Sequence, residues 1–131
     1  MIAAGLVVAA VAGLIHAWIF VLESLWFERP SIYARFGLAS AEQASIVRGF
    51  AFNQGFYNLF LAVGAGLGVV LMLLGHDDVS RFAAGRAIAI FSCASMAAAG
   101  VVLIATDRRF ARAAALQFVP GLAAALLLGI A

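Results

Sequence analysis

Long apolar runs alternate with short charged segments along the chain. The runs cover roughly residues 2–27, 48–74, 83–106 and 110–130. Each reaches the about 20 apolar residues that a helix needs to cross a bilayer. The runs are continuous and rich in Ala, Leu and Gly, whereas strands of a membrane barrel alternate apolar and polar residues over about ten positions. The pattern therefore predicts four transmembrane helices.

Composition supports the same class of protein. Of the 131 residues, 66% are hydrophobic and 11% are charged, and the mean hydropathy is +1.13. Soluble domains carry roughly a quarter of charged residues. We predict an all-α polytopic membrane protein with one domain over residues 1–131, its four helices forming an antiparallel bundle. The first run has no basic segment before it and is longer than the about 7 to 15 apolar residues of a signal peptide, so we expect a retained helix.

The distribution of the arginines predicts an orientation. The chain has no lysine, and the first and third connections carry three arginines each, six in all, against two in the second connection. Positive charge favours the cytoplasmic side, so we expect both termini outside the cytoplasm. The arginines lie at membrane edges and form no basic groove, which argues against nucleic acid as a partner. They are Arg29, Arg35 and Arg48 in the first connection, Arg81 and Arg86 in the second, and Arg108, Arg109 and Arg112 in the third.

Polar side chains gather at one level of the predicted bundle. At about 1.5 Å per residue, Asn53 and Gln54 of the second helix lie at the depth of Glu23, and Asn58 approaches the depth of His16. His16 and Glu23 are two helical turns apart and share a face. Polar groups in hydrocarbon cost several kcal/mol unless they satisfy one another, so we predict an inward-facing cluster in the cytoplasmic half. Its candidate ligand-binding residues are His16, Glu23, Trp26, Asn53, Gln54, Tyr57, Asn58 and Gln117.

Structural roles could also account for these residues. Glu23 could form an ion pair with Arg48 or Arg29 instead of serving as a titrating group or ligand contact, and His16 could bond to Asn58 or Tyr57. The amides could be interhelical contacts worth roughly 0.6 to 2 kcal/mol each. The number of polar residues argues against a purely structural role, since fewer polar groups would be enough to hold the helices together. We expect Glu23 to lie within hydrogen-bonding reach of Asn53, Gln54 or Gln117.

The sequence predicts no metal site, and we assign no cofactor. Cys93 is the single cysteine, so no cysteine-based zinc motif is present, and the small residues around it favour a packing role. His76 lies in the predicted external loop, away from His16. The glycine motifs GAGLG (64–68) and GLAAALLLG (121–129) predict close helix packing. The catalytic residues stay unknown, because no nucleophile, base and orienting group form a recognisable set.

Three stretches resemble a known family. HAWIFVLESLWF, NQGFYNLFLAVG and the tail AAGVVLIAT followed by LQFVP are similar to a family of small four-helix bacterial membrane proteins, domain of unknown function 1304. The resemblance covers nearly the whole chain. It implies a multi-pass protein of the bacterial inner membrane, and it implies no activity. The sequence departs from the family pattern at Leu59 and Gly121, and neither change removes a polar group.

Three function classes stay open at this point. The cluster could bind an unidentified small ligand or an ion, including a proton-coupled permeation route. The protein could be an accessory or assembly subunit of a larger membrane complex, which fits its small size and short loops. It could be an enzyme for an apolar substrate, with Glu23 and His16 as acid and base, although the sequence leans against this. The expected partners are the lipid bilayer and either a second copy of the chain or a larger complex.

Overall fold

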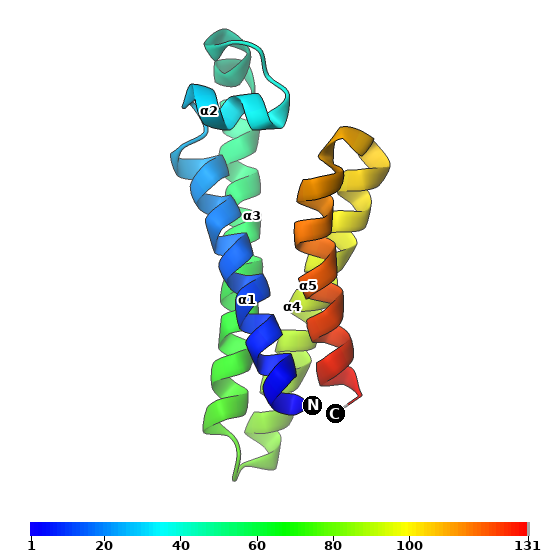
Figure 1. The fold of residues 1–131 in the computed structure, drawn as a ribbon. Coiled ribbons are helices and arrows are strands. Elements are labelled where there is room, and N and C mark those ends of the chain that lie inside the picture. Colours follow the sequence, from blue (N-terminus) through cyan, green and yellow to red (C-terminus); the bar gives the residue numbers. More distant parts are fainter. Residues whose placement is uncertain (131) are drawn as a thin grey trace. The chain divides into compact units, whose positions relative to one another are not determined.

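A computed structural model describes residues 1–130 of the chain (Figure 1). It consists of α1 (Ile2–Phe20), η1 (Val21–Leu25), α2 (Pro30–Tyr33), η2 (Ala34–Phe36), α3 (Ala41–Leu74), α4 (Val79–Thr106), η3 (Arg108–Phe110) and α5 (Ala111–Gly129). The described residues contain no strand. Four helical segments are long and apolar enough to cross a membrane: Ile2–Leu25, Ala41–Leu74, Val79–Thr106 and Arg108–Gly129. The predicted fold class, an all-α membrane protein with four transmembrane helices, is confirmed.

The second membrane-spanning helix, α3, begins earlier than its apolar run predicts. Its first turns, from Ala41, are polar, so the hydrophobic pattern alone places the start near residue 48. The start follows from capping: the Ser40 hydroxyl accepts a hydrogen bond from the Gln43 backbone N–H, and the Gln43 side chain accepts one from the Ala39 backbone N–H. The first bond satisfies an N–H group of the first turn that has no helical partner, and the second ties the residue before the cap to the helix. The polar residues from Ala41 onward are thus the beginning of α3 itself.

The chain divides into two compact units, which we describe separately. The bundle unit contains Met1–Ile15 and residues 61–130, and so holds parts of all four membrane-spanning helices. The polar unit is His16–Phe60, with the end of α1, the first half of α3 and the connection between them. The interpretation of the chain as a single domain stays a prediction.

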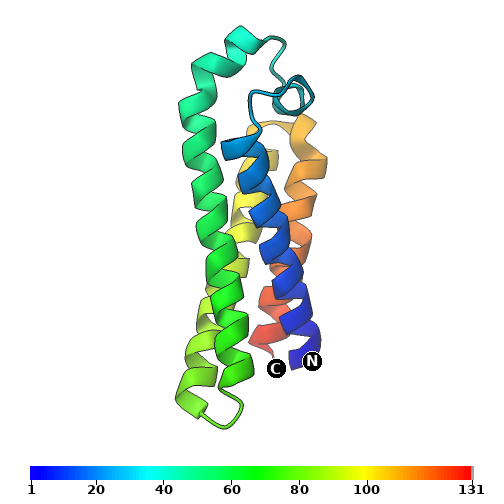
Figure 2. The same ribbon diagram turned by 90° about the vertical axis from the view of Figure 1, so that its left-hand side faces the viewer.

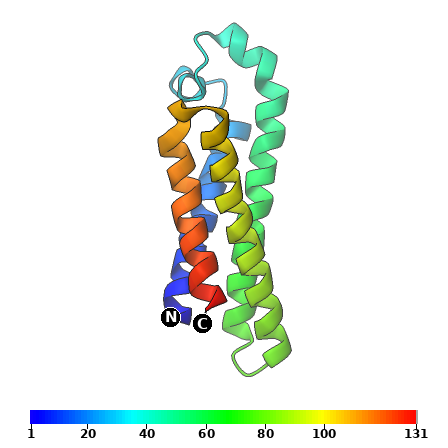
Figure 3. The ribbon, with the colours of Figure 1, turned by 90° about the vertical axis from the view of Figure 1, so that its right-hand side faces the viewer.

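The core of the bundle unit is made of small and flexible side chains. Figure 3 shows α4 and α5 side by side and antiparallel. Alanine, methionine and cysteine dominate its buried cluster, which lets the helix backbones approach closely. The cluster consists of Ala9, Ala12, Ala65, Met72, Ala89, Cys93, Met96, Ala124 and Leu128. The packing role predicted for Cys93 is confirmed, since its side chain is fully buried there.

Glycines mark the closest contacts between helices of the bundle unit. A Cβ atom added to Gly68 of α3 would lie 2.6 Å from the backbone nitrogen of Ala89 in α4. One added to Gly5 of α1 would lie 2.6 Å from a methyl carbon of Leu128 in α5. Because α1 and α5 meet there, the start of α1 and the end of α5 lie side by side in all three ribbon views. The close packing predicted for the first glycine motif is confirmed at Gly68.

The polar unit is a helical hairpin with a structured connection. Figure 2 shows the short α2 turn in the connection between the end of α1 and the start of α3. Pro30 stands at the first position of α2, where a missing N–H costs no hydrogen bond. Phe27 and Ile32 are buried, and Phe27 packs on Phe36 with ring centroids 5.3 Å apart. This connection joins the end of the first helix, which carries Glu23, to the start of α3.

Candidate functional site

Asn58 of α3 is the centre of a hydrogen-bonded triad in the polar unit. The triad consists of His16, Glu23 and Asn58. Asn58 Oδ1 lies 2.7 Å from His16 Nδ1, and Asn58 Nδ2 donates to Glu23 Oε2 at 2.9 Å and to the Gln54 backbone oxygen at 3.1 Å. His16 is 1% exposed and Asn58 is 6% exposed, while Glu23 is half-buried. The triad therefore links α1, η1 and α3 through buried polar contacts.

The partners fix the direction of every bond in the triad. Both groups near Asn58 Nδ2 accept hydrogen bonds, so the amide nitrogen must face them and its oxygen must face His16. Because an amide oxygen can only accept, His16 Nδ1 carries the proton and donates. In the neutral imidazole the other ring nitrogen then holds a lone pair and can only accept.

That second ring nitrogen, His16 Nε2, lacks a partner. It is the one buried side-chain nitrogen or oxygen within residues 1–130 that makes no hydrogen bond. Buried polar atoms in proteins are nearly always paired, because leaving one unpaired costs about 1–3 kcal/mol. The triad thus satisfies Asn58 and leaves one acceptor of His16 unoccupied.

Glu23 reaches Asn58 from a π-helical turn. In η1 the Trp26 backbone N–H donates to the Val21 oxygen at 2.9 Å, a bond across five residues instead of the four of an α-helix. The turn is fastened to α3 by the Ser24 hydroxyl, which donates to the Phe52 backbone oxygen at 2.8 Å. The π-helical turn ends this first helix, because Trp26 has a non-helical backbone with a φ of -116°.

Two small features that the sequence reading missed let the helices approach at this level. A Cβ atom added to Gly55 would collide with the Ser24 hydroxyl and would lie 3.1 Å from Glu23 Cβ. Gly55 therefore provides the space that the turn occupies. A serine next to a glutamate in an apolar helix, opposite a glycine in the partner helix, was the available signal.

Asn53, Gln54 and Tyr57 belong to the predicted cluster but not to the triad. All three are exposed, and Tyr57 has 55% of its surface exposed. Gln54 contributes only its backbone oxygen. Within residues 1–130 the only hydrogen bond of the Glu23 side chain goes to Asn58, so the expected bonds to Asn53 and Gln54 do not form. A helical side chain leans toward the N-terminus, which directs Glu23 toward the level of His16 and past those two amides.

Trp26 and the nearby arginines have other contacts. The Trp26 ring meets Trp18 edge to face, with centroids 5.4 Å apart, and the Arg29 guanidinium carbon lies 4.3 Å from the Trp26 centroid. Arg48 Nε lies 3.1 Å from Glu28 Oε2 in an exposed ion pair. The alternative in which these arginines pair with Glu23 is therefore not what the structure shows.

Gln117 lies in the other unit. It is a half-exposed residue of α5. The triad belongs to the polar unit, so the place of Gln117 in the cluster stays a prediction. Within residues 1–130 no group of three or more His, Cys, Asp or Glu side chains could hold a metal ion. His76 pairs instead with its neighbour Asp77 at 2.7 Å, fully outside the apolar segments.

Comparison with known proteins gives one family and no individual relative. The model of the family described as "Protein of unknown function (DUF1304)" matches residues 9–129, a range that includes His16, Glu23 and Asn58. No curated protein and no solved structure matches the chain. Since the family model covers nearly all of the sequence, the chain belongs to the DUF1304 family.

Proposed function

We propose that the triad of His16, Glu23 and Asn58 binds a small polar molecule or an ion inside the membrane. The observation that carries this proposal is the unpaired, buried Nε2 of His16. A contact that only joins the helices would not need a free Nε2 atom on His16, because Asn58 already bonds to both other members of the triad. An acceptor kept unpaired in an apolar bundle is accounted for by a partner that comes and goes.

The bonding pattern defines the chemistry of that ligand. Both N–H groups of Asn58 are used, and so is the N–H of His16 Nδ1. What the triad still offers is the lone pair of His16 Nε2 and the second oxygen of Glu23, and both accept. The favoured ligand therefore donates hydrogen bonds or carries positive charge, as an alcohol, an amine or a cation does. A proton is the smallest such ligand, and this is how proton-coupled permeation enters the proposal.

Native mass spectrometry of protein released gently from its own membrane tests this function. We expect a small adduct on the wild type that is lost in Glu23→Gln, since the amide still accepts the bond from Asn58 but loses the negative charge. Ser95→Ala is the control, because among the described residues the Ser95 hydroxyl bonds only to the Phe91 oxygen of its own helix. The adduct should persist there.

The same measurement distinguishes the alternative classes. Bare protein in both wild type and Glu23→Gln would contradict the binding proposal. Protein that arrives in fixed stoichiometry with a large assembly would favour the accessory-subunit function instead. A bound molecule that is chemically converted by the protein would favour the enzyme function.

We also propose the cytoplasmic side for the first and third connections. The support is the asymmetry of six arginines against two. Single cysteines introduced at Ala39 and at Asp77, in a Cys93→Ala background, test it with a reagent that does not cross the membrane. Labelling of intact cells should modify the variant at position 77 and spare the variant at position 39. The reverse result would invert the orientation.

A further inference from the structure

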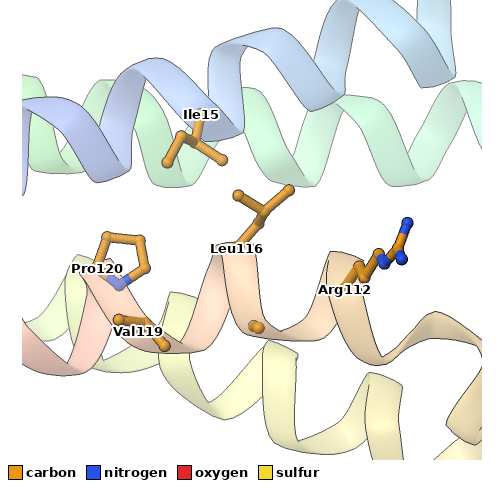
Figure 4. A pocket seen from close by; sticks show the side chains of 6 residues that line it. Ile15, Arg112, Leu116, Val119 and Pro120 are labelled. Atoms are coloured by element: carbon orange, nitrogen blue, oxygen red, sulfur yellow. The ribbon is translucent and has the colours of Figure 1, made fainter.

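An apolar groove with a basic end runs along one face of α5 in the bundle unit. Its volume is about 520 Å³, and it is lined by Ile15, Arg112, Ala115, Leu116, Val119 and Pro120. Figure 4 shows Ile15 of α1 and Leu116 of α5 pointing toward one another across it. Binding sites for small molecules have volumes of about 300 to 1,000 Å³, so the groove is large enough to hold part of a ligand.

The spacing of the lining residues gives the groove its direction. Arg112, Leu116 and Val119 follow one another at intervals of four and three residues, which places them on one face of the helix. From Arg112 to Pro120 the groove therefore extends about 12 Å along the helix axis. This is the direction in which lipid chains run when a helix crosses the membrane.

Pro120 lies at the other end of the groove from Arg112. Pro120 lies inside α5, where it has no N–H to donate to the Leu116 carbonyl. Its ring also crowds that carbonyl, so α5 lacks one intrahelical hydrogen bond beside the groove. Leu116 and Val119 keep 58% and 59% of their surface exposed. These apolar surfaces require an apolar occupant.

The end of the groove at Arg112 carries a positive charge without an ionic partner in the described bundle unit. Arg112 lies in the first turn of α5 and makes no ion pair or side-chain hydrogen bond with any described residue of the bundle unit. Its neighbour Arg109 is different, because the Arg109 guanidinium is bound to Asp107 with an Nη2 to Oδ2 distance of 2.7 Å. The Arg112 guanidinium is thus free to bind an anion at this end of the apolar groove.

We propose that this groove binds an anionic phospholipid, with one acyl chain along Leu116 and Val119 and the phosphate at Arg112. A guanidinium recognises phosphate by paired hydrogen bonds, and basic pockets between transmembrane helices bind anionic lipid headgroups. A zwitterionic lipid brings its own cation, which offsets the attraction. The proposal is independent of the proposed function, since all lining residues belong to the bundle unit and none to the triad.

Lipid retention measures this site. The purified protein is equilibrated with equal amounts of phosphatidylglycerol and phosphatidylcholine of the same chain length, and the bound lipids are counted by native mass spectrometry. We expect the wild type to retain phosphatidylglycerol with a preference of about fivefold, the ratio for one basic residue near a membrane surface. Arg112→Gln should bring the ratio close to one, and Arg112→Lys should keep part of the preference.

A second variant and a matched control separate the groove from general charge effects. Leu116→Trp fills the groove and should reduce the retention of both lipids while Arg112 is still present. Arg108→Gln removes an exposed arginine of η3 that does not line the groove, and it should leave the preference unchanged. An equal loss in Arg108→Gln and Arg112→Gln would overturn the proposal, as would a wild type without preference. Helical circular dichroism confirms that each variant is folded.

Discussion

The side chains of His16 and Asn58 meet at 2.7 Å between α1 and α3, and both are almost completely buried. The contact joins residues 42 positions apart and sets the orientation of both side chains. Because Asn58 also holds Glu23, one amide determines which atoms of the other two residues stay available. The polar groups of the first half of α3 and of the end of the first helix are thus arranged around a single asparagine.

Replacement of Asn58 should destabilise the protein. Asn58→Ala removes the partners of His16 Nδ1, Glu23 Oε2 and the Gln54 oxygen together. We expect the free energy of unfolding in mixed micelles to fall by about 1–3 kcal/mol, the cost of unsatisfied buried groups. Asn53→Ala is the comparison, because Asn53 is exposed and surface changes stay within about 0.5 kcal/mol. Equal effects at both positions would argue against a central role for Asn58.

The space beside the π-helical turn should be intolerant of a methyl group. Gly55→Ala directs a Cβ atom into Ser24, so the turn must shift away from α3. We expect a lower thermal midpoint and loss of the proposed adduct. Gly49→Ala lies in the same helix with nothing within 4 Å of the added atom, and it should be neutral or stabilising because alanine favours helix by about 1 kcal/mol over glycine. A tolerated Gly55→Ala would mean that the turn is not tightly packed.

Helix contact in the bundle unit offers a similar paired test. Gly68→Ala would place a Cβ atom 2.7 Å from the Gly85 oxygen as well as close to Ala89, and backbone atoms cannot move aside singly. We expect a loss of about 1–3 kcal/mol in unfolding free energy, typical of overpacking. Gly66→Ala adds the same atom two positions away into open space and should cost nothing. Comparable stability of the two variants would contradict the close contact of α3 and α4.

Arg86 should protect the last turn of α5. Its Nε donates to the Leu128 oxygen at 2.7 Å and its Nη2 to the Gly129 oxygen at 3.0 Å, which are carbonyls without helical partners. In Arg86→Met we expect amide exchange at the end of α5 to accelerate by about tenfold to a hundredfold, because a hydrogen bond from a charged group contributes about 1.5–3 kcal/mol. Arg108→Met should leave this exchange unchanged. Unaltered exchange in Arg86→Met would show that these carbonyls do not depend on the arginine.

The third connection should respond to acid through Asp107. The Arg109 side chain donates two hydrogen bonds to Asp107 Oδ2, and the Arg109 backbone N–H donates to Oδ1, which lowers the pKa of the Asp107 carboxyl. A carboxyl whose pKa is lower in the folded state contributes its stability above the unfolded-state pKa of about 3.9. That contribution is lost as the pH falls through the lowered value.

Carboxyl carbon chemical shifts followed by NMR give the pKa of Asp107 directly. We expect a midpoint below about 3.9 in the wild type and a return toward that value in Arg109→Gln. Arg108→Gln should leave the midpoint in place, because Arg108 makes no bond to this carboxyl. A wild-type midpoint at or above the ordinary value would refute the pairing.

The four helices could be predicted because hydrocarbon permits few alternatives. A chain in a bilayer must satisfy its backbone internally, so continuous apolar runs become helices. The start of α3 at Ala41 escaped this reasoning, since its first turns are polar and depend on the cap at Ser40. Helix existence thus followed from hydrophobicity, whereas the helix boundary followed from local hydrogen bonds.

The candidate site was predictable in depth but not in detail. His16 and Asn58 were expected at nearly the same level, and they bond to each other. Glu23 was expected to meet Asn53, Gln54 or Gln117, and within the polar unit it bonds to Asn58. Counting residues gives the height of a backbone position, but it gives neither the lean of the side chain nor the π-helical turn, for which VLESL carries no known signature.

The π-helical turn also imposes a strict rule on chain length. The bond from Trp26 to Val21 encloses one more residue than an α-helical turn would. Deleting one residue within Val21–Leu25 would remove the extra residue and let the turn close as an ordinary α-helix. Deleting Val21 or Leu22 would shift Glu23 by one position relative to His16, which turns its side chain by about 100° around the helix axis. Homologous chains that keep the triad should therefore align without gaps from His16 to Trp26.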